Sequence, residues 1–450
     1  MPSTSGAYRA AVRLGVAVAP ALGFLRPRIR AGVRARSAAG ARLLDWSRSH
    51  RDPNRPLVWF HAASVGEGRQ AESVLLALRR RCPECQMVYT HFSPSAEALA
   101  KGIPSDASDY LPYDLPENVD RLLQQLQPDL LVFAKLDVWP ELSTRAAGAG
   151  ADLALIAATV SPGSSRLRWL ARRLLEPGYR AITVAAAISP DDALRLEQLG
   201  VAPDRIQVLG DPRFDSVVAR VKGVAPDDPL LRLGDGAPTL VAGSTWPEDE
   251  AVLLRAFAGI LREQPDAKLI LVPHEPTAAH LARVERNTRG AGLPHPIRLG
   301  SATERDSIIL GDRVGVLATL YGAGTMAYVG GGFGRAGLHS VLEPAAWGLP
   351  VVFGPRWQNS RDAGLLLQAG AAQALGDQRP DPAAEALRAQ WQGWISDEAA
   401  RETQGARALE VVNSGMGASE QTADLLARLI SRSRPRKLRS SAPADLQSKS

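Results

Sequence analysis

The stretch Leu57-Val-Trp-Phe-His-Ala-Ala-Ser-Val-Gly-Glu-Gly68 joins an apolar run of strand length to a turn with two glycines, and a helical pattern follows over residues 71–80. Short apolar runs that alternate with helical stretches are typical of a parallel sheet whose strands are buried on both faces. The stretch therefore predicts a strand, a turn and a helix, which together form one βα unit.

The same pattern recurs in two series along the chain. The first series has apolar runs at 57–60, 87–90, 130–133, 153–156 and 182–185, and the second has runs at 239–242, 269–272, 307–310, 327–329 and 351–353. Residues 225–237, rich in Asp and Pro, separate the two series and are the expected linker. The pattern predicts an α/β protein with two Rossmann-like domains, with the cleft between them as the expected ligand site.

Composition excludes several classes of protein. The chain has 450 residues, of which 45% are hydrophobic and 22% charged, as is usual for globular proteins with real cores and not for disordered or collagen-like chains. Its two cysteines cannot form a disulfide framework, and we interpret Cys82 and Cys85 as core or surface thiols, not as a metal or redox site. Residues 431–450 lack periodicity and are predicted to be a disordered tail.

The N-terminal segment, residues 1–56, carries eleven arginines, no lysine and two acidic residues. Its apolar run, residues 14–25, is too short to span a bilayer, which takes about 20 residues. The Arg-dense stretch 26–36 then opposes export as a signal peptide. We interpret residues 1–56 as a basic amphipathic segment at a membrane surface. The alternative is a helix that packs on the protein's own core.

A glycine-rich stretch, residues 330–337, follows the run at 327–329. Glycines let a backbone approach a phosphate closely, so the N–H groups near Gly331 and in the turn 337–339 are expected to face one. His339 and Glu343 stand four residues apart and would share one face of a helix, where Glu343 could accept hydrogen bonds from a ribose. The alternatives are a tight turn and an imidazole that is bonded within the fold.

Glu67 follows the first strand and is flanked by glycines. A carboxylate beside a ligand cleft can deprotonate a hydroxyl group, which makes Glu67 a candidate general base. The alternative is an acidic residue that favours the start of a helix through the helix dipole.

Nine segments together resemble the bacterial 3-deoxy-D-manno-oct-2-ulosonic acid (Kdo) transferases, over residues 57–370. Their order and spacing carry the resemblance. The segments are His61–Glu67, Leu111–Pro116, Trp139-Pro140, Gly210–Asp215, Gly243–Thr245, Gly311-Asp312 with Leu320-Tyr321, Val329–Gly331, Gly337–Leu338–His339 through Glu343-Pro344, and Gly354-Pro355 with Asn359.

The resemblance implies a GT-B glycosyltransferase that transfers Kdo from CMP-Kdo to a lipid A precursor of the lipid IVA type, in lipopolysaccharide core biosynthesis. Transfer would proceed with inversion, without a metal or cofactor, at the cytoplasmic face of the inner membrane and without a nucleic-acid partner. Residues 57–212 would be the acceptor-binding domain and residues 213–430 the nucleotide-sugar-binding domain. The implied catalytic residues are Glu67 and Asp137, with Ser64 on the acceptor side, and the donor-binding residues are Arg213, Ser244, Thr245, His274, Gly315, Gly331, His339, Glu343 and Asn359.

The sequence departs from the family pattern at several of these positions. The family's Glu-Thr-Glu-Leu-Trp-Pro is Lys135-Leu-Asp-Val-Trp-Pro140 here, which places a lysine on the acceptor side and keeps an acid at Asp137. The family's Pro-Arg-His is Pro273-His274-Glu275, and its Ser-Thr-His ends in Trp246. These changes concern the identity of the acceptor more than the fold or the type of reaction.

The basic stretch 166–175 follows a strand of the first domain and would be an amphipathic helix. Arg166 and Arg168, with Lys135, could meet the phosphates of a lipid A-type acceptor, because guanidinium groups bind phosphate bidentately. The alternative is a solvated surface helix.

Two further functions stay open on the sequence alone. One is another nucleotide-sugar enzyme of GT-B architecture, such as a UDP-sugar transferase or epimerase. The other is a basic, non-enzymatic scaffold on membranes or nucleic acid.

Overall fold

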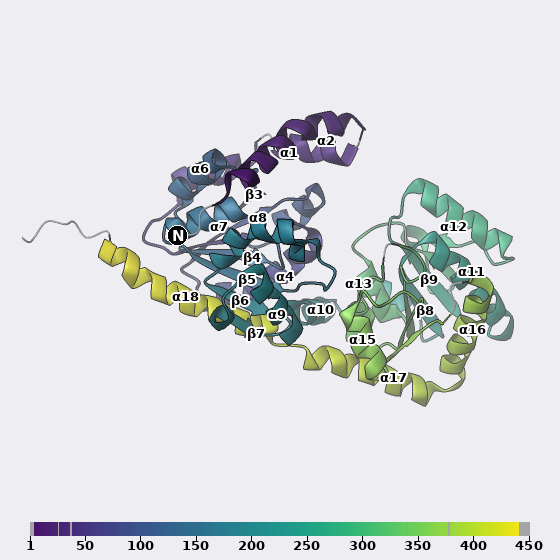
Figure 1. The fold of residues 1–450 in the computed structure, drawn as a ribbon. Helices are drawn as coiled ribbons and strands as arrows, with labels where there is room; N and C mark the ends of the chain where they lie inside the picture. The colour runs from purple at the N-terminus through teal and green to yellow at the C-terminus, as the bar shows by residue number, and fades with distance from the viewer. Residues whose placement is uncertain (1–3, 26, 37, 336, 377–378, 441–450) are drawn as a thin grey trace, which may run out of the picture. The chain divides into compact units, whose positions relative to one another are not determined.

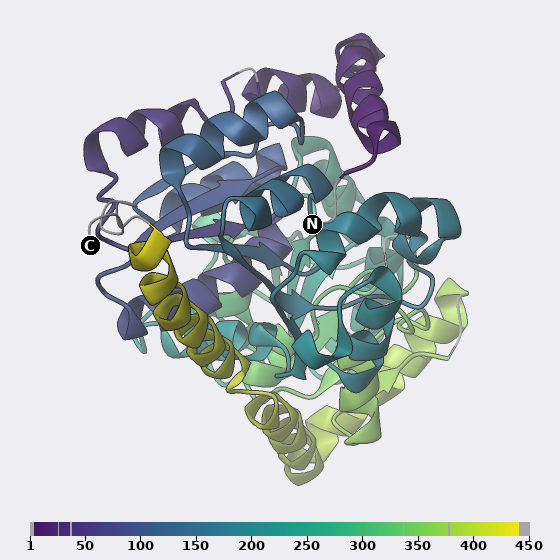
Figure 2. The ribbon, with the colours of Figure 1, turned by 60° about the vertical axis from the view of Figure 1, so that its left-hand side comes forward.

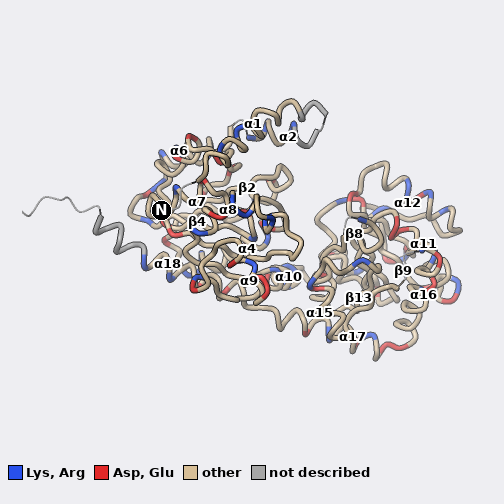
Figure 3. The backbone as a smooth tube through the Cα atoms, viewed as in Figure 1, with Lys and Arg blue, Asp and Glu red and all other residues tan. Residues whose placement is uncertain are grey.

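The computed structural model describes residues 4–25, 27–36, 38–335, 337–376 and 379–440. The chain forms two compact units: unit 1 comprises Met1–Ser216 and Met416–Ser450, and unit 2 comprises Val217–Gly415 (Figure 1). Basic and acidic residues are interspersed over both units (Figure 3).

Unit 1 is built on a seven-stranded parallel sheet in the order β3-β2-β1-β4-β5-β6-β7. Its strands are β1 Leu57–His61, β2 Gln86–His91, β3 Ala107–Tyr110, β4 Leu130–Ala134, β5 Asp152–Ala158, β6 Val184–Ala187 and β7 Ile206–Val208. Its helices are α1 Gly6–Leu25, α2 Pro27–Arg36, α3 Ala41–His50, α4 Val65–Arg81, α5 Glu97–Gly102, α6 Pro116–Leu126, α7 Pro140–Gly148, α8 Trp169–Arg180, α9 Pro190–Leu199 and α18 Ala418–Ser440, while α10 Pro212–Lys222 crosses the boundary between the units.

Unit 2 also has a seven-stranded parallel sheet, in the order β10-β11-β9-β8-β12-β13-β14. Its strands are β8 Thr239–Thr245, β9 Lys268–Pro273, β10 Ile297–Arg298, β11 Ile308–Leu310, β12 Met326–Val329, β13 Val351–Phe353 and β14 Ala372–Ala374. Its helices are α11 Pro247–Glu263, α12 Ala278–Gly290, α13 Leu317–Leu320, α14 Leu342–Ala346, α15 Arg361–Gln368, α16 Pro380–Ser396 and α17 Glu398–Ser414. The two parallel sheets with their helices confirm the predicted pair of Rossmann-like domains.

Each sheet separates two apolar layers. In unit 1, Trp59, Val88 and Phe133 face one layer, while Phe60 and Tyr89 face the other. This alternation follows from the two-residue side-chain period of a strand, and it explains why the central strands are continuous apolar runs. The sheet of unit 2 likewise separates two apolar clusters.

The boundary between the units lies within α10, at Ser216, and not in residues 225–237. Residues 229–233 form a 3-10 helix, and Leu233 is buried in the core of unit 2. The buried ammonium group of Lys268 donates hydrogen bonds to the carbonyl oxygens of Leu233 and Gly234 at 3.2 and 3.1 Å. The Asp- and Pro-rich stretch is therefore part of unit 2 and is no linker.

The last helix, α18, belongs to unit 1, although residues 213–430 were expected in the second domain (Figure 2). Its buried Leu426 and Ile430 join the apolar cluster that contains Val74 and Leu78 of α4. Asp215 accepts hydrogen bonds at 2.7 and 2.8 Å from the backbone N–H groups of residues 417 and 419, at the start of α18. Sequence periodicity does not show which domain a terminal helix covers.

The predicted disorder of residues 431–450 is wrong for residues 431–440, because α18 continues to Ser440. The helix continues through Pro435, a poor helix former, because extending a formed helix needs no new nucleation and the Arg, Lys and Leu residues of this stretch favour a helix. Residues 441–450 lie outside the described part of the chain.

Cys82 and Cys85 are buried in the core of unit 1 near the end of α4. Burial raises the pKa of both thiols. Protonated thiols are poor metal ligands and poor nucleophiles. Their proximity to the exposed carboxylate of Glu84 is therefore weak support for a metal site.

Candidate functional site

The order of the strands marks one position in each sheet where ligands bind in open α/β folds. In unit 1 the direction of strand succession reverses between β1 and β4, and in unit 2 it reverses between β8 and β12. The loops after these strands leave the carboxyl edge of the sheet at a topological switch point. The candidate residues Ser64 and Glu67 follow β1, and Asp137 follows β4. Ser244 lies near the end of β8, whereas Gly331 and His339 follow β12.

In unit 1 a chain of hydrogen bonds runs from the core to Asp137. The indole N–H of Trp59 donates to Thr90 Oγ1 at 2.8 Å, and Thr90 Oγ1 lies 3.0 Å from Nδ1 of the fully buried His61. His61 Nε2 lies 3.1 Å from Asp137 Oδ2, which also accepts the indole N–H of Trp139 at 3.1 Å. The chain fixes the position of the Asp137 carboxylate.

Asp137 is held in its charged form. Burial alone would raise its pKa, but hydrogen bonds from His61 and Trp139, together with the positive charge of Arg166, lower it overall. Arg166 lies 3.7 Å from Asp137 Oδ1, the oxygen that does not face His61. The structure therefore brings together two candidates that stand 29 residues apart in the chain.

Glu67 lies at the third position of α4, where it closes a reciprocal cap with Ser64. The Ser64 backbone N–H donates to Glu67 Oε2 at 3.1 Å, and the Glu67 N–H points to Ser64 Oγ at 3.5 Å. Both side chains are half-buried. Glu67 thus acts at the start of the helix, as the alternative interpretation expected, and its Oε1 makes no hydrogen bond within the described residues.

The other candidates that lie in unit 1 are arranged as follows. Lys135, which directly follows β4, has a positive φ of 62°, a strained conformation for a residue other than glycine. Arg168 is exposed and precedes α8, which begins only at Trp169. Arg166 lies in a 3-10 turn, so the two arginines are not on the predicted helix. Arg213 lies in unit 1, where its Nε and Nη2 both donate to Oδ2 of the buried Asp211 at 2.9 and 2.6 Å, and not in unit 2, where it was expected.

In unit 2 the buried carboxylate of Asp249 joins the two loops at the switch point. Asp249 accepts hydrogen bonds from the Trp246 N–H at 2.9 Å, the Gly331 N–H at 2.9 Å and the Tyr328 hydroxyl at 2.7 Å. Burial raises the pKa of Asp249 to about 6, although these hydrogen bonds lower it. The N–H of Gly331 is therefore directed at Asp249, and the expectation that it faces a phosphate is wrong.

Three aromatic side chains, Trp246, His274 and His339, contact one another. The indole N–H of Trp246 donates to His339 Nε2 at 3.0 Å, and the planes of the two rings are nearly parallel, at 9° to each other. His274 stacks on both, with ring centroids 4.3 Å from His339 and 5.1 Å from Trp246. Burial and the neighbouring His274 lower the pKa of His339 to about 4, so this imidazole is neutral near pH 7.

His339 and Glu343 do not share a helical face, because α14 begins only at Leu342. The His339 N–H is bonded to the Gly330 carbonyl oxygen at 3.1 Å, which keeps the preceding residues in the glycine loop. Glu343 instead forms an ion pair with Arg220 of α10 at 2.8 Å. The pair brings a cation and a carboxylate to the end of the loop.

The remaining candidates of unit 2 lie in the last two residues of β8 or in loops at the same edge of the sheet. Ser244 has a positive φ of 53°, and the neighbouring buried Thr245 donates to Glu250 Oε1 at 3.2 Å. A Cβ atom at Gly337 would lie 2.5 Å from the Asn359 side-chain nitrogen, so only glycine fits there without a shift. Gly315 has a φ of 89° and is exposed in the loop after β11.

Sequence reasoning missed the residues that support the candidates: Trp59, His61 and Thr90 in unit 1, and Asp249 in unit 2. Asp249 carried a signal, because an acidic residue three positions after the start of a helix often bonds a backbone N–H at that end. The contacts of His61 and Thr90 left no signal in the sequence, because these residues belong to separate strands.

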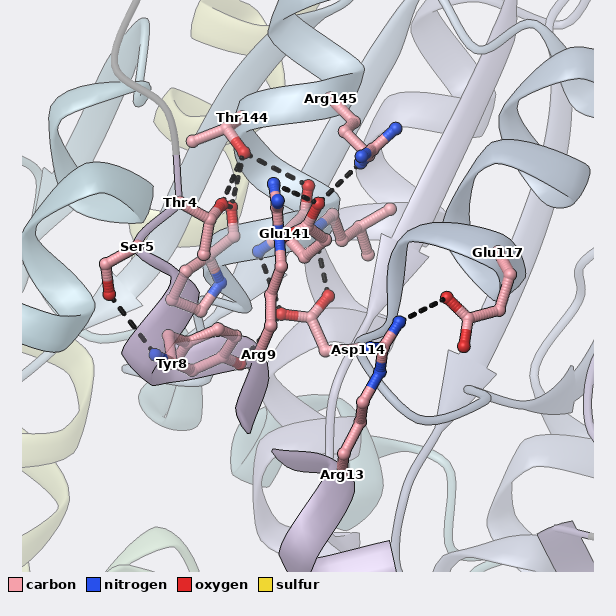
Figure 4. Close-up of polar contacts among 12 residues, drawn as sticks. Thr4, Ser5, Tyr8, Arg9, Arg13, Asp114, Glu117, Glu141, Thr144 and Arg145 are labelled. Carbon is pink, nitrogen blue, oxygen red and sulfur yellow. Dashed lines mark hydrogen bonds and ion pairs between the residues drawn. The ribbon is translucent and has the colours of Figure 1, made fainter. Parts of the chain in front are cut away.

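A cluster of polar contacts fastens the start of α1 to α7, and we call it the α1 latch (Figure 4). Arg9 forms a bidentate ion pair with the fully buried Glu141, and the Tyr8 hydroxyl donates to the buried Asp114 at 2.7 Å. Asp114 also accepts the N–H groups of Glu141 and Leu142 at the start of α7, both at 2.8 Å. Burial raises the pKa of Asp114 to about 6.

Beyond the latch, α1 exposes an apolar face. The side chains at 7, 11, 14, 18 and 21 all lie on one side of the helix, are all exposed and are all Ala, Leu or Val; Leu14 is 66% exposed and Val18 42%. A surface helix usually turns polar residues to solvent. Within the described residues no helix is both long enough and apolar enough to span a bilayer.

The two Rossmann-like units define the GT-B fold class. Among solved structures, UDP-GlcNAc 2-epimerase from Neisseria meningitidis is similar at a TM-score of 0.58 and 12% identity, covering 84% of this chain and 100% of the other, which shows the fold alone.

The sequence comparisons identify the family within this class. A family model described as 3-deoxy-D-manno-octulosonic-acid transferase (kdotransferase) matches residues 36–216. The 3-deoxy-D-manno-octulosonic acid transferase of Bordetella pertussis is 30% identical, covering 72% of this chain and 77% of that protein. The protein of the same name from Haemophilus influenzae is 26% identical, covering 83% and 87%. The chain belongs to this transferase family, and it is a glycosyltransferase.

Proposed function

We propose that the protein transfers Kdo from CMP-Kdo to a lipid A precursor of the lipid IVA type, as a step in lipopolysaccharide synthesis. The observation that carries the proposal is that both switch points hold residues of the family motifs, over a chain that matches Kdo transferases along most of its length. Unit 1 would bind the acceptor and unit 2 the nucleotide sugar.

In this mechanism an acceptor hydroxyl attacks the anomeric carbon of Kdo while the bond to CMP breaks, and the configuration inverts. Glu67 takes the proton of the attacking hydroxyl, because a neutral sugar hydroxyl is a poor nucleophile at neutral pH. Oε2 stays on the Ser64 N–H, which leaves Oε1 for the acceptor. The reaction needs no metal in this proposal, because CMP can depart with its phosphate stabilised by hydrogen bonds.

Asp137 and Arg166 would bind the acceptor together. The hydrogen-bond chain from Trp59 to Asp137 orients the carboxylate. Its Oδ1, the oxygen near Arg166, can accept a hydrogen bond from a sugar hydroxyl. Arg166, Arg168 and Lys135 would meet the anionic groups of a phosphorylated lipid.

Reversing the charge of Arg166 and Arg168 to Glu should raise the KM for the lipid acceptor tenfold or more, roughly the loss of one charge-assisted contact. The affinity for CMP should not change. The matched control is Arg180→Glu at the far end of α8, where the arginine is 62% exposed. Normal transfer by the double variant would show that this stretch is only surface and that the acceptor's phosphates are met elsewhere.

Glu343→Ala should raise the Kd for CMP roughly tenfold, because Glu343 would bind the ribose hydroxyls through charge-assisted hydrogen bonds. Calorimetry with CMP measures the change. Arg220→Ala is the control, since it also breaks the Arg220–Glu343 ion pair but keeps the carboxylate. If Glu343→Ala binds CMP as the wild type does, or if both variants lose the same affinity, Glu343 does not hold the ribose.

We also propose that α1 lies in the surface of the inner membrane, at its cytoplasmic face. Its exposed apolar face supports insertion into the acyl boundary, and the Arg-rich segment of residues 26–36 suits anionic head groups.

The direct test of the proposed function is incubation of the purified protein with CMP-Kdo, generated in situ, and a lipid A precursor, followed by mass spectrometry of the lipid. A mass increase of one or more Kdo units supports the proposal. The fold also suits a UDP-sugar enzyme. Thermal stabilisation by UDP but not by CMP, with no modified lipid, would favour that function instead.

A further inference from the structure

We propose that Trp246 is a positioning residue for nucleotide binding, which acts by fixing the tautomer and the plane of His339. This inference rests on the proposed function, because it takes unit 2 as the donor-binding half. Trp246 and His274 are two positions at which the sequence departs from the family pattern, and the structure places their rings in contact, at 5.1 Å between centroids.

The hydrogen bond between Trp246 and His339 has only one possible direction. An indole N–H is a donor and has no acceptor, so His339 Nε2 must accept it at 3.0 Å. A neutral imidazole carries its proton on the other nitrogen, which makes Nδ1–H the donor. Burial and His274 hold the pKa of His339 near 4, in agreement with a neutral ring.

Trp246 is itself held in place by hydrogen bonds, so it can fix the tautomer and the plane of His339. Its backbone N–H is bonded to the buried Asp249, which also binds the Gly331 N–H. The His274 N–H donates to the carbonyl oxygen of Thr245, the residue before Trp246, at 3.0 Å. The Trp246 end of the contact is therefore tied to a buried carboxylate, and the His339 end is tied to the Gly330 carbonyl oxygen by its backbone N–H at 3.1 Å.

The arrangement gives His339 a defined role towards a nucleotide. The rings of Trp246 and His339 are nearly parallel, and the ring of the exposed His274 stacks on both. The half-buried His339 would present a single neutral Nδ1–H donor to an anionic or carbonyl oxygen of the donor nucleotide. Without Trp246, the imidazole could turn or change tautomer and present an acceptor instead.

The test uses the full-length protein labelled with 15N-histidine. In the wild type, NMR should show His339 protonated at Nδ1. Trp246→Phe keeps an aromatic ring but removes the N–H, and it should give a mixture of tautomers together with a Kd for CMP that is roughly threefold to tenfold higher, as for the loss of one hydrogen bond.

Trp246→His can restore an N–H donor and should recover part of the affinity. The matched control is Trp347→Phe, which removes another half-buried indole N–H of unit 2, bonded to the Ala318 carbonyl oxygen at 2.6 Å. That variant should leave both the tautomer and the affinity unchanged.

An unchanged tautomer in Trp246→Phe would overturn the inference, and so would a changed tautomer with wild-type affinity for CMP. Failure of the proposed function would give a different result, because the wild type itself would not bind CMP. The proposed role of Trp246 in nucleotide binding would then be wrong as well. The tautomer measurement would then still decide whether Trp246 fixes His339.

Discussion

Glu67→Gln should lower kcat for Kdo transfer by roughly two orders of magnitude or more, which is the usual contribution of a general base. Glutamine cannot accept the proton of the attacking hydroxyl. It can still accept the Ser64 N–H through its amide oxygen, because Gln serves as well as Glu at this position of a capping box. The loss of rate would therefore not come from unfolding of α4. CMP affinity should stay within about twofold, because Glu67 belongs to unit 1.

Glu72→Gln is the matched control for this experiment. Glu72 is half-buried on the same helix and pairs with Arg69 at 2.9 Å, so its substitution removes an equal charge without touching the strand-end loop. Near-normal turnover by Glu67→Gln would rule out Glu67 as the general base. Equal losses in both variants would point to the charge of α4 and not to proton transfer.

Placing Glu at both Leu14 and Val18 should shift the protein from the membrane fraction to the soluble fraction. Burying each side chain in the acyl boundary contributes about 1.5–3 kcal/mol, so together they change partitioning by roughly two orders of magnitude or more. Sedimentation with vesicles that contain anionic lipid measures the shift. Leu194 and Val208, 59% and 48% exposed elsewhere in unit 1, provide the control substitutions to Glu.

The α1 latch makes this a better test than deletion of residues 1–36. Deletion removes Tyr8 and Arg9 and leaves the buried carboxylates of Asp114 and Glu141 short of partners. A buried charge that loses its partner costs about 3–5 kcal/mol, so deletion would weaken unit 1 as well as release it. Release of the full-length wild type by high salt alone would contradict insertion, because salt screens charge and does not weaken apolar contacts.

The sequence predicted the central strands of both sheets, and the four strands it missed are all edge strands. β3, β7, β10 and β14 end the two sheets, and they are two to four residues long. An edge strand has a neighbour on one side only and is partly exposed, so it need not be a continuous apolar run. Polar residues such as Asp109 and Gln207 therefore hid two of them.

Local spacing predicted which loops hold the candidate residues, but not how they meet. The four-residue interval between His339 and Glu343 indicated a shared helical face. In the structure the backbone N–H of His339 is bonded to the Gly330 carbonyl oxygen and the helix begins only after His339, so Glu343 pairs with Arg220 instead. The contacts of Asp137 with His61 and Arg166 join the end of β1 to the segments that follow β4 and β5, which no periodicity connects. Such pairings depend on the order of strands in the sheet, which a single sequence does not reveal.

The place of α18 has a consequence for how the protein is made. The core of unit 1 is closed by Leu426 and Ile430, which the ribosome adds only after the whole of unit 2. At about 5–20 residues per second, the 199 residues of Val217–Gly415 take roughly 10–40 s to synthesise, and α4 lacks its covering helix throughout. A nonsense mutation near codon 416 would leave unit 2 whole. Unit 1, which carries Glu67, would then lack α18, and the apolar residues that α18 covers would be exposed to chaperones and proteases.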